Sequence, residues 1–350
     1  MVMRRVSILL LGLLLAGGLL AQKQKKKADE EPRPQVLEVL PDTPEAVVAD
    51  TERLSFQVSP LSDKGLLSQQ VRDALKAVAR LNHGVSIIKI RAFVAGSGDL
   101  RRIKDIVAEE FTERKQTLPA VSTIQVGGLP LPGAQVVIET ISSEKKVVNP
   151  DGLVFLSAAA STNAAGSVAK LENSLKNVGA KAADVLRVTC FLSSLDDVQA
   201  ARSAVATAFP AAAANFLQMQ RLGLERQTLC EAIARASGNP LADAPASGVA
   251  LIHSAKIVLT ATQLVFRDQD SDFRLAYQRL EKTLLPLGAT FKDVFWTGTY
   301  ALTQPGAAKL ENVQGGFFDR ASPLAHTALQ IEGLPSTDAT AAVELMAVGR

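Results

Sequence analysis

Cysteine and histidine are scarce in this chain of 350 residues, which holds two cysteines and three histidines. His83, His253 and His326 stand far apart, so no Cys/His group has the spacing of a metal site. No base is identifiable near a candidate nucleophile either. We therefore expect neither a metal ion nor a cofactor, and we interpret each histidine as a turn or surface residue.

The two cysteines, Cys190 and Cys230, both lie in apolar runs typical of strands. In an exported protein they could be oxidised to one disulfide. Buried thiols, however, commonly behave as small hydrophobic residues. Between these alternatives we favour two buried thiols.

Aromatic residues make up only 5% of the chain, although 47% of it is hydrophobic. The cores are therefore expected to be aliphatic, and the stacking platforms of single-stranded nucleic-acid binders are missing. The net charge is +3, but residues 1–27 contain six basic residues and no acidic one, which leaves −3 for the rest. A basic tail on a non-basic body argues against a nucleic-acid partner.

The first 21 residues are typical of an export signal. Arg4 and Arg5 precede an apolar run over 6–20, which is short for a membrane span, and Ala21 offers a cleavage point. No cysteine is present there for a lipoprotein anchor. We expect a periplasmic or secreted protein with a cleaved leader. The basic run 23–27 would hinder translocation, so the alternative is an uncleaved anchor, the only case in which a membrane is a partner.

One pattern occurs three times after this leader, which indicates an internal repeat. Each copy has an amphipathic helix with apolar residues at helical spacing, then an apolar strand, a second helix and a proline-marked turn. The first helices cover 71–78, 168–178 and 273–284, and the strands after them 86–94, 184–192 and 293–301. Each copy closes on a strand with one glutamate, 20 or 21 residues after its proline: Pro119 and Glu139, Pro210 and Glu231, Pro323 and Glu344.

This repeat predicts an α+β fold of three β-β-α-β-α-β-β modules. We divide the chain into a signal peptide (1–21), a linker with a first-strand lead-in (22–48), modules over 49–145 and 146–238, and a linker with the third module (239–350). A sheet with both helices on one face needs a cover for its other face. We therefore expect a pseudo-threefold assembly within one chain, sheets inward and helices outward, that is monomeric.

The segment TLPAVSTIQVGGLPLPGAQVVIETIS resembles the C-terminal signature of the RidA/YjgF family, also called L-PSP endoribonucleases. That signature reads approximately P-x-R-[ST], an apolar strand, a Leu-Pro turn and a strand ending in I-E-x-x-A. The resemblance extends through ALKAVARLNHGVSIIKIRAFV and, more loosely, through the other two copies. It implies a chorismate-mutase-like fold, ligand clefts between modules, and hydrolysis of imines or enamines to keto acids and ammonia.

The family's carboxylate-binding arginine lies two residues after the proline, where guanidinium can grip a carboxylate with two hydrogen bonds. In this chain the matching cleft positions hold Val121, Ala212 and Ala325, so all three copies lack the arginine. A polar family position in the second helix corresponds to Lys104 and Arg202, and to Glu311 or Asn312 in the third copy. Lys104 and Arg202 either replace the arginine in the cleft or are solvated helix charges, the interpretation we favour.

The strand glutamate of the family is kept in every copy, which makes Glu139, Glu231 and Glu344 the candidate catalytic residues. They could instead close a polar network between copies, and we favour that interpretation. Three functions follow. The chain binds a small metabolite or a partner without the standard deaminase site, which we favour, or it is an imine deaminase with a rearranged site. A ribonuclease fits least, because the body is not basic.

Overall fold

The computed structural model describes residues 39–96, 98–220, 225–238, 248–253, 255–318 and 324–350. The predicted signal peptide, most of the linker over 22–48, Pro323 and residues 239–247 of the second linker lie outside the described residues. Residues from Leu40 onward form one compact unit. Among the described helices, none is both long and apolar enough to cross a membrane.

Three mixed sheets carry the fold, and the same connections recur in each. The first module runs β2 (Leu54–Val58), α1 (Leu67–Leu81), β3 (Ser86–Ala95), α2 (Arg102–Glu113), β4 (Ala120–Val126) and β5 (Val136–Ser143). The second runs β6 (Leu153–Ser161), α3 (Ala164–Asn177), β7 (Val185–Leu192), α4 (Val198–Ala208), β8 (Ala213–Gln218) and β9 (Thr228–Arg235). The third runs β11 (Lys256–Thr260), β12 (Gln263–Phe266), α5 (Asp270–Leu284), β13 (Val294–Ala301), α6 (Gln304–Gln314), β14 (Ala325–Gln330) and β15 (Ala339–Val348).

The pairing within each sheet is the same in all three modules. The closing strand lies antiparallel to the first strand on one side and to the central strand on the other. The central strand then pairs in parallel with the strand after the second helix. These elements match the repeated pattern of the sequence, because the apolar helix and strand positions fix the same layers each time.

Two strands cross from one module to the sheet of another. The strand β1 (Ala46–Asp50) precedes the first module but pairs with β11 of the third, and β10 (Val249–Ile252) precedes the third module but pairs with β6 of the second. The expectation that each copy begins with a strand pair in its own sheet is therefore wrong. A short 3-10 turn over Thr51–Arg53 diverts the chain between β1 and β2, and the Thr51 amide is anchored on the Ala255 carbonyl at 3.2 Å.

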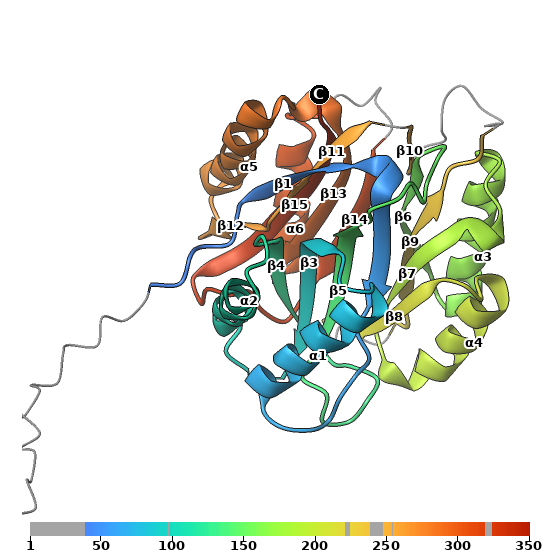
Figure 1. Ribbon diagram of the computed structural model, residues 1–350, viewed down its shortest axis with the longest axis horizontal. Helices are drawn as coiled ribbons and strands as arrows, with labels where there is room; N and C mark the ends of the chain where they lie inside the picture. The colour runs from blue at the N-terminus through green and yellow to red at the C-terminus, as the bar shows by residue number, and fades with distance from the viewer. Residues whose placement is uncertain (1–38, 97, 221–224, 239–247, 254, 319–323) are drawn as a thin grey trace, which may run out of the picture. The chain divides into compact units, whose positions relative to one another are not determined.

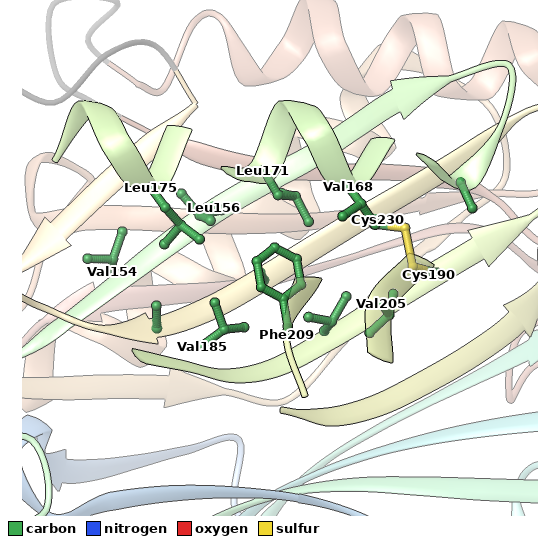
Figure 2. Packing of buried hydrophobic residues seen from close by; sticks show 14 of the residues in the cluster. Val154, Leu156, Val168, Leu171, Leu175, Val185, Cys190, Val205, Phe209 and Cys230 are labelled. Atoms are coloured by element: carbon green, nitrogen blue, oxygen red, sulfur yellow. A yellow bond between two sulfur atoms is a disulfide. The ribbon is translucent and has the colours of Figure 1, made fainter. Parts of the chain in front are cut away.

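The helices lie on the outside of this unit and the strands toward its centre (Figure 1). Each pair of helices covers the outer face of one sheet and forms a separate core. The first two cores are mainly aliphatic, as expected, but the third contains contacting rings of Tyr277, Phe291 and Phe317. In the second module, Val168, Leu171 and Leu175 of α3 point onto the strands below (Figure 2). Two further apolar clusters draw residues from all three modules, because the inner faces of the sheets face one another. The α+β class, with sheets inward and helices outward, is thus confirmed.

The cysteines form a disulfide, so the preference for two buried thiols was wrong. Cys190 on β7 and Cys230 on β9 are directly opposite residues of the antiparallel ladder, with Cα atoms 4.1 Å apart (Figure 2). Both are fully buried beneath α3. The sequence alone hides this pairing, because it depends on the register of two strands 40 residues apart.

Candidate functional site

Six ionisable side chains meet where the inner faces of the three sheets converge. They are three carboxylates and three cations, none more than 4% exposed: Glu139, Glu231, Glu344, Lys89, Arg91 and Arg187. Their formal charges cancel. Apolar clusters from all three modules lie on either side of this central charge layer along the strands. We use that name for these six residues below.

Arg91 connects all three glutamates. One terminal nitrogen lies 2.7 Å from Glu231 Oε1 and 3.2 Å from Glu139 Oε2, and its Nε lies 3.2 Å from Glu344 Oε1. The other terminal nitrogen donates a hydrogen bond of 3.0 Å to the Tyr300 hydroxyl, which itself donates to Glu344 at 2.6 Å. A planar guanidinium with several donors can satisfy partners from three directions, which a lysine ammonium could not do in the same plane.

The other two cations complete the pairing of the carboxylates. Lys89 donates to Glu344 at 2.7 Å, to Ser122 at 2.6 Å and to the carbonyl of Thr260 at 2.6 Å. Arg187 lies 3.3 Å from a Glu139 oxygen and 3.5 Å from a Glu231 oxygen. Neutral donors from the neighbouring strands fill further carboxylate positions: Thr189 and Asn215 on Glu139, and Thr327 on Glu231.

The strand registers explain why these residues meet. The residues opposite the three glutamates on the central strands are Arg91, Thr189 and Gly298, and two positions earlier stand Lys89, Arg187 and Trp296. The alternation of a strand points all of them to the inner face. The first module thus supplies two cations, the second one and the third none, although each supplies one carboxylate.

Gly298 leaves the space that this arrangement needs. A Cβ at this position would come within 2.6 Å of the Trp296 ring and 2.8 Å of the Tyr300 hydroxyl. The Arg91 guanidinium in turn lies 5.5 Å from the Trp296 ring centroid and 5.1 Å from that of Phe93. At the two inward positions where the other modules have charged or hydroxyl side chains, the third module has the Trp296 ring and Gly298, which has no side chain.

The surrounding cations keep the buried Glu139 and Glu344 carboxylates ionised. Burial alone would raise the pKa of Glu139, but Arg187 and Arg91 together with the Thr189 and Asn215 hydrogen bonds hold it below its ordinary value. Burial also opposes ionisation of Glu344, yet Lys89 and Arg91 lower its pKa to about 2. Both groups therefore act as permanent anions near neutral pH.

This burial separates the three glutamates from the clefts. None of them lines any of the four cavities described below. Each instead bonds or pairs with side chains of more than one module. The geometry supports the role of an interface network for Glu139, Glu231 and Glu344 and gives them no access to a ligand in those cavities.

Cavities lie where neighbouring modules meet. A cavity of about 700 Å³ lies between the second and third modules, one of about 370 Å³ between the first and second, and one of about 240 Å³ between the third and first. A fourth, of about 270 Å³, lies between α6 and its sheet and shares Gln304 and Ala328 with the largest. Among the described residues, no group of histidine, cysteine and acidic side chains is arranged to hold a metal ion.

Two of the three positions that were aligned with the family's arginine need a correction. By strand register, Val121 corresponds to Ala214 in the second module and to His326 in the third. The alignment from the prolines named Ala212 and Ala325, because β4 begins directly after Pro119 whereas β8 begins three residues after Pro210. Val121 lies in the core of its own module, Ala212 packs on the second core, and Ala325 is buried between modules.

The second-helix positions do reach the clefts. Lys104, Arg202 and Glu311 each follow the strand residue opposite the glutamate by 13 positions. They stand third, fifth and eighth in α2, α4 and α6, so this count selects Glu311 over Asn312 without making the three positions structurally equivalent. Lys104 lines the 240 Å³ cavity, Arg202 the 370 Å³ cavity and Glu311 the 270 Å³ cavity. Arg202 also lies over the Phe216 ring, 5.9 Å from its centroid.

His326 is a cleft residue that the sequence reasoning missed. Its Nε2 lies 3.0 Å from Thr299 Oγ1, at hydrogen-bond distance, and its backbone N–H donates to Ser157 of the second module at 2.8 Å. Burial lowers its pKa, and the nearby Glu311 only partly opposes this. The imidazole is therefore neutral near pH 7. An alignment by strand register instead of by proline would have revealed it.

Comparison with known proteins gives one family match and several structural likenesses. Residues 49–144 match the sequence model of the family described as endoribonuclease L-PSP. No curated protein matches the chain. Similar solved structures include a YjgF/YER057c/UK114 family member from Mycobacterium tuberculosis, with 22% identity over 28% of this chain and 86% of that one and a TM-score of 0.25. Another is E. coli TdcF with bound serine, with 20% identity over 27% and 81% of the two chains and a TM-score of 0.25. A third is RidA from Psychrobacter, with 17% identity over 26% and 80% and a TM-score of 0.24.

Removing the central cation should expose the dependence of the carboxylates on it. We expect Arg91→Met to lower the free energy of unfolding by about 3–5 kcal/mol, because it leaves buried carboxylates without their partner. Adding Glu231→Gln to that variant should recover part of the loss, although Glu231→Gln alone is destabilising. Urea unfolding followed by circular dichroism measures both. Arg101→Met, at an exposed ion pair, is the control and should change nothing measurable; strictly additive effects of the two core substitutions would contradict the network.

Acid should weaken the fold through the same carboxylates. Because the pKa of Glu344 is about 2 in the folded protein and that of Glu139 is also lowered, the unfolded chain binds more protons below about pH 4.5. The free energy of unfolding should therefore fall as the pH drops from about 4.5 toward 2. Urea midpoints measured across this range test the expectation, and a midpoint independent of pH there would contradict it.

Proposed function

We propose that this chain, whose residues 49–144 match the family model described as endoribonuclease L-PSP, is an exported RidA-like protein that binds a small molecule between its second and third modules. The observation that carries this proposal is the cavity of about 700 Å³ at that boundary. Its volume falls within the range of small-molecule sites. Its described lining is mostly polar, and its one charged residue is the acidic Glu225. The other lining residues are Ser193, Gln220, Gln227, Thr303, Gln304 and Gln330, beside Met219, Leu229, Leu302 and Ala328.

The proposed ligand is held without the family's carboxylate clamp. The register puts Val121, Ala214 and His326 at the clamp positions, so no guanidinium is present there. The glutamates that match the family strand motif are enclosed in the central charge layer. Side-chain amides and hydroxyls can orient a polar ligand by hydrogen bonds without such a clamp.

A second candidate is an imine or enamine deaminase with a rearranged site, and His326 favours it. A neutral imidazole at 3.0 Å from the Thr299 hydroxyl, in a cavity that adjoins the largest one, could act as a general base on water. In that reaction the water oxygen bonds to the imine carbon, the carbon–nitrogen bond breaks, and ammonia leaves with the protons. We rank this candidate second because the clamp positions offer no guanidinium for the substrate carboxylate.

Export is the second part of the proposal. The leader pattern of the sequence motivates it, and the Cys190–Cys230 disulfide supports it, since structural disulfides persist in oxidising compartments. We propose that the mature protein is a periplasmic or secreted monomer without a nucleic-acid partner. A membrane is a partner only if the leader is retained.

Filling the cavity should abolish ligand binding. Ala328 lines both the 700 and 270 Å³ cavities, and its counterpart in the second module is Phe216, so Ala328→Phe inserts a side chain that the fold already accepts at that register. A ligand-observed NMR screen of polar metabolites should give binders to the wild type that this variant loses. Ala206→Phe, at an exposed position of α4, should keep them.

The same variants decide between binding and catalysis. Imines generated in situ by an amino-acid oxidase should be hydrolysed at the uncatalysed rate if the chain only binds. Acceleration that is lost in His326→Gln would instead establish the deaminase. Wild-type protein with no binders and no acceleration would refute both candidates.

Cleavage of the leader and formation of the disulfide together predict the mass of the intact mature protein. The protein recovered from the periplasm or medium should begin near Gln22 and be lighter by two hydrogen atoms than its reduced form. Mass spectrometry before and after reduction measures both features. An intact Met1 in the membrane fraction, or two thiols that can be alkylated in denaturant without reductant, would contradict this expectation.

A further inference from the structure

The cavities at the three module boundaries differ in the charge of the second-helix residue that lines them. The second-helix residue that faces each cleft is basic in two cases, Lys104 and Arg202, and acidic in the third, Glu311. Lys104, Arg202 and Glu311 lie in the first, middle and last turns of their helices, so the comparison concerns the charge that each cavity receives and not one equivalent backbone position. Glu311 gives the boundary between the second and third modules an acidic side chain where the other two boundaries have a basic one.

We infer that the cleft between the second and third modules takes a small alkylammonium ligand, a deepening that rests on the proposed binding function. Among the described residues that line its two adjoining cavities, Glu225 and Glu311 are the charged ones, and both are acidic. The cavity between the first and second modules instead contains Arg202, and the remaining one contains Lys104 with Glu45. A carboxylate in the acidic cleft would meet like charges, whereas an ammonium would meet opposite ones.

The neutral groups of this cleft suit a ligand that only donates hydrogen bonds. An ammonium has three donors and no acceptor. Gln220 uses its amide nitrogen to donate to the Leu302 carbonyl at 3.1 Å, which leaves its side-chain oxygen as the acceptor. His326, neutral at pH 7, adds a ring nitrogen that can accept, and Gln304 borders both cavities.

The identity of the clamp residue agrees with this change. The position that binds a carboxylate through arginine in the resembled family carries an uncharged imidazole here, and its nearest charged group in the cavity is Glu311. At this boundary the clamp position on β14 is thus uncharged, and α6 contributes an acidic side chain. Since the two positions are 15 residues apart in the sequence, one local rearrangement of the chain does not account for both.

Three probes of one carbon skeleton test the inference. Putrescine is a dication, 1,4-butanediol is neutral and succinate is a dianion, so they differ mainly in charge. Isothermal titration at low ionic strength, where exposed charges are least screened, should rank putrescine above butanediol. Glu311→Gln should weaken putrescine binding by about tenfold or more, as expected for the loss of a charge-assisted contact.

The second-helix residues of the other clefts supply matched controls. Arg202→Gln and Lys104→Gln should leave putrescine affinity within about twofold, because they lie in separate cavities. Glu311→Lys restores the basic residue of the other modules and should create an additional succinate site. Glu311 is exposed on α6, so these variants should unfold at the wild-type temperature, which the same samples verify by circular dichroism.

The outcomes separate the ligand class from the binding function. Equal affinity for the three probes, or a putrescine affinity unaffected by Glu311→Gln, would overturn the alkylammonium assignment. In that case the metabolites displaced by Ala328→Phe would still establish the cleft as a binding site. Absence of any ligand sensitive to Ala328→Phe would overturn the binding function, and the assignment with it.

Discussion

The mutual neutralisation of three buried cations by three buried carboxylates is the constraint on which this architecture depends. An unpaired charge in such an interior costs several kcal/mol, so the sheets can close on one another only when every partner is present. The partners come unequally from the modules, with Lys89 and Arg91 from the first, Arg187 from the second and none from the third. The first module alone carries an excess of positive charge and the third an excess of negative charge, so three copies of either would not neutralise their centre. Charge balance at this centre therefore requires the first and third modules together.

This inequality has a consequence for the clefts. In a trimer of identical chains, a substitution appears in every site at once. Here each cleft is encoded separately, so Arg202, Lys104 and Glu311 can differ while the sheets beneath them keep one register. The same separation lets the third module carry His326 where its neighbours carry valine and alanine. The interior is constrained by pairing, and the module boundaries are free to diverge.

Much of the fold follows from sequence periodicity, because apolar residues at helical and strand spacing determine which faces are buried. The helices α1, α3 and α5 and the strands β3, β7 and β13 lie where that spacing predicts. The convergence of the glutamates was also foreseeable, since they occupy one inward position of a repeated strand. Their cationic partners were a missed signal: Lys89, Arg91 and Arg187 interrupt strands that are otherwise apolar, where an isolated charge needs a buried counter-charge. The disulfide and His326 depend on register between distant strands and on turn length, which periodicity does not encode.

The strand exchange described for β1 has a further consequence, for the time course of folding. β1 is the first described strand of the chain, yet its partner β11 begins about 200 residues later and itself pairs with β15 at the end. When the chain is synthesised from its N-terminus, β1 has no pairing partner until the strands of the third module have formed. Contacts of such long sequence separation slow folding. The first described strand of the chain is thus among the last to gain its pairing partner.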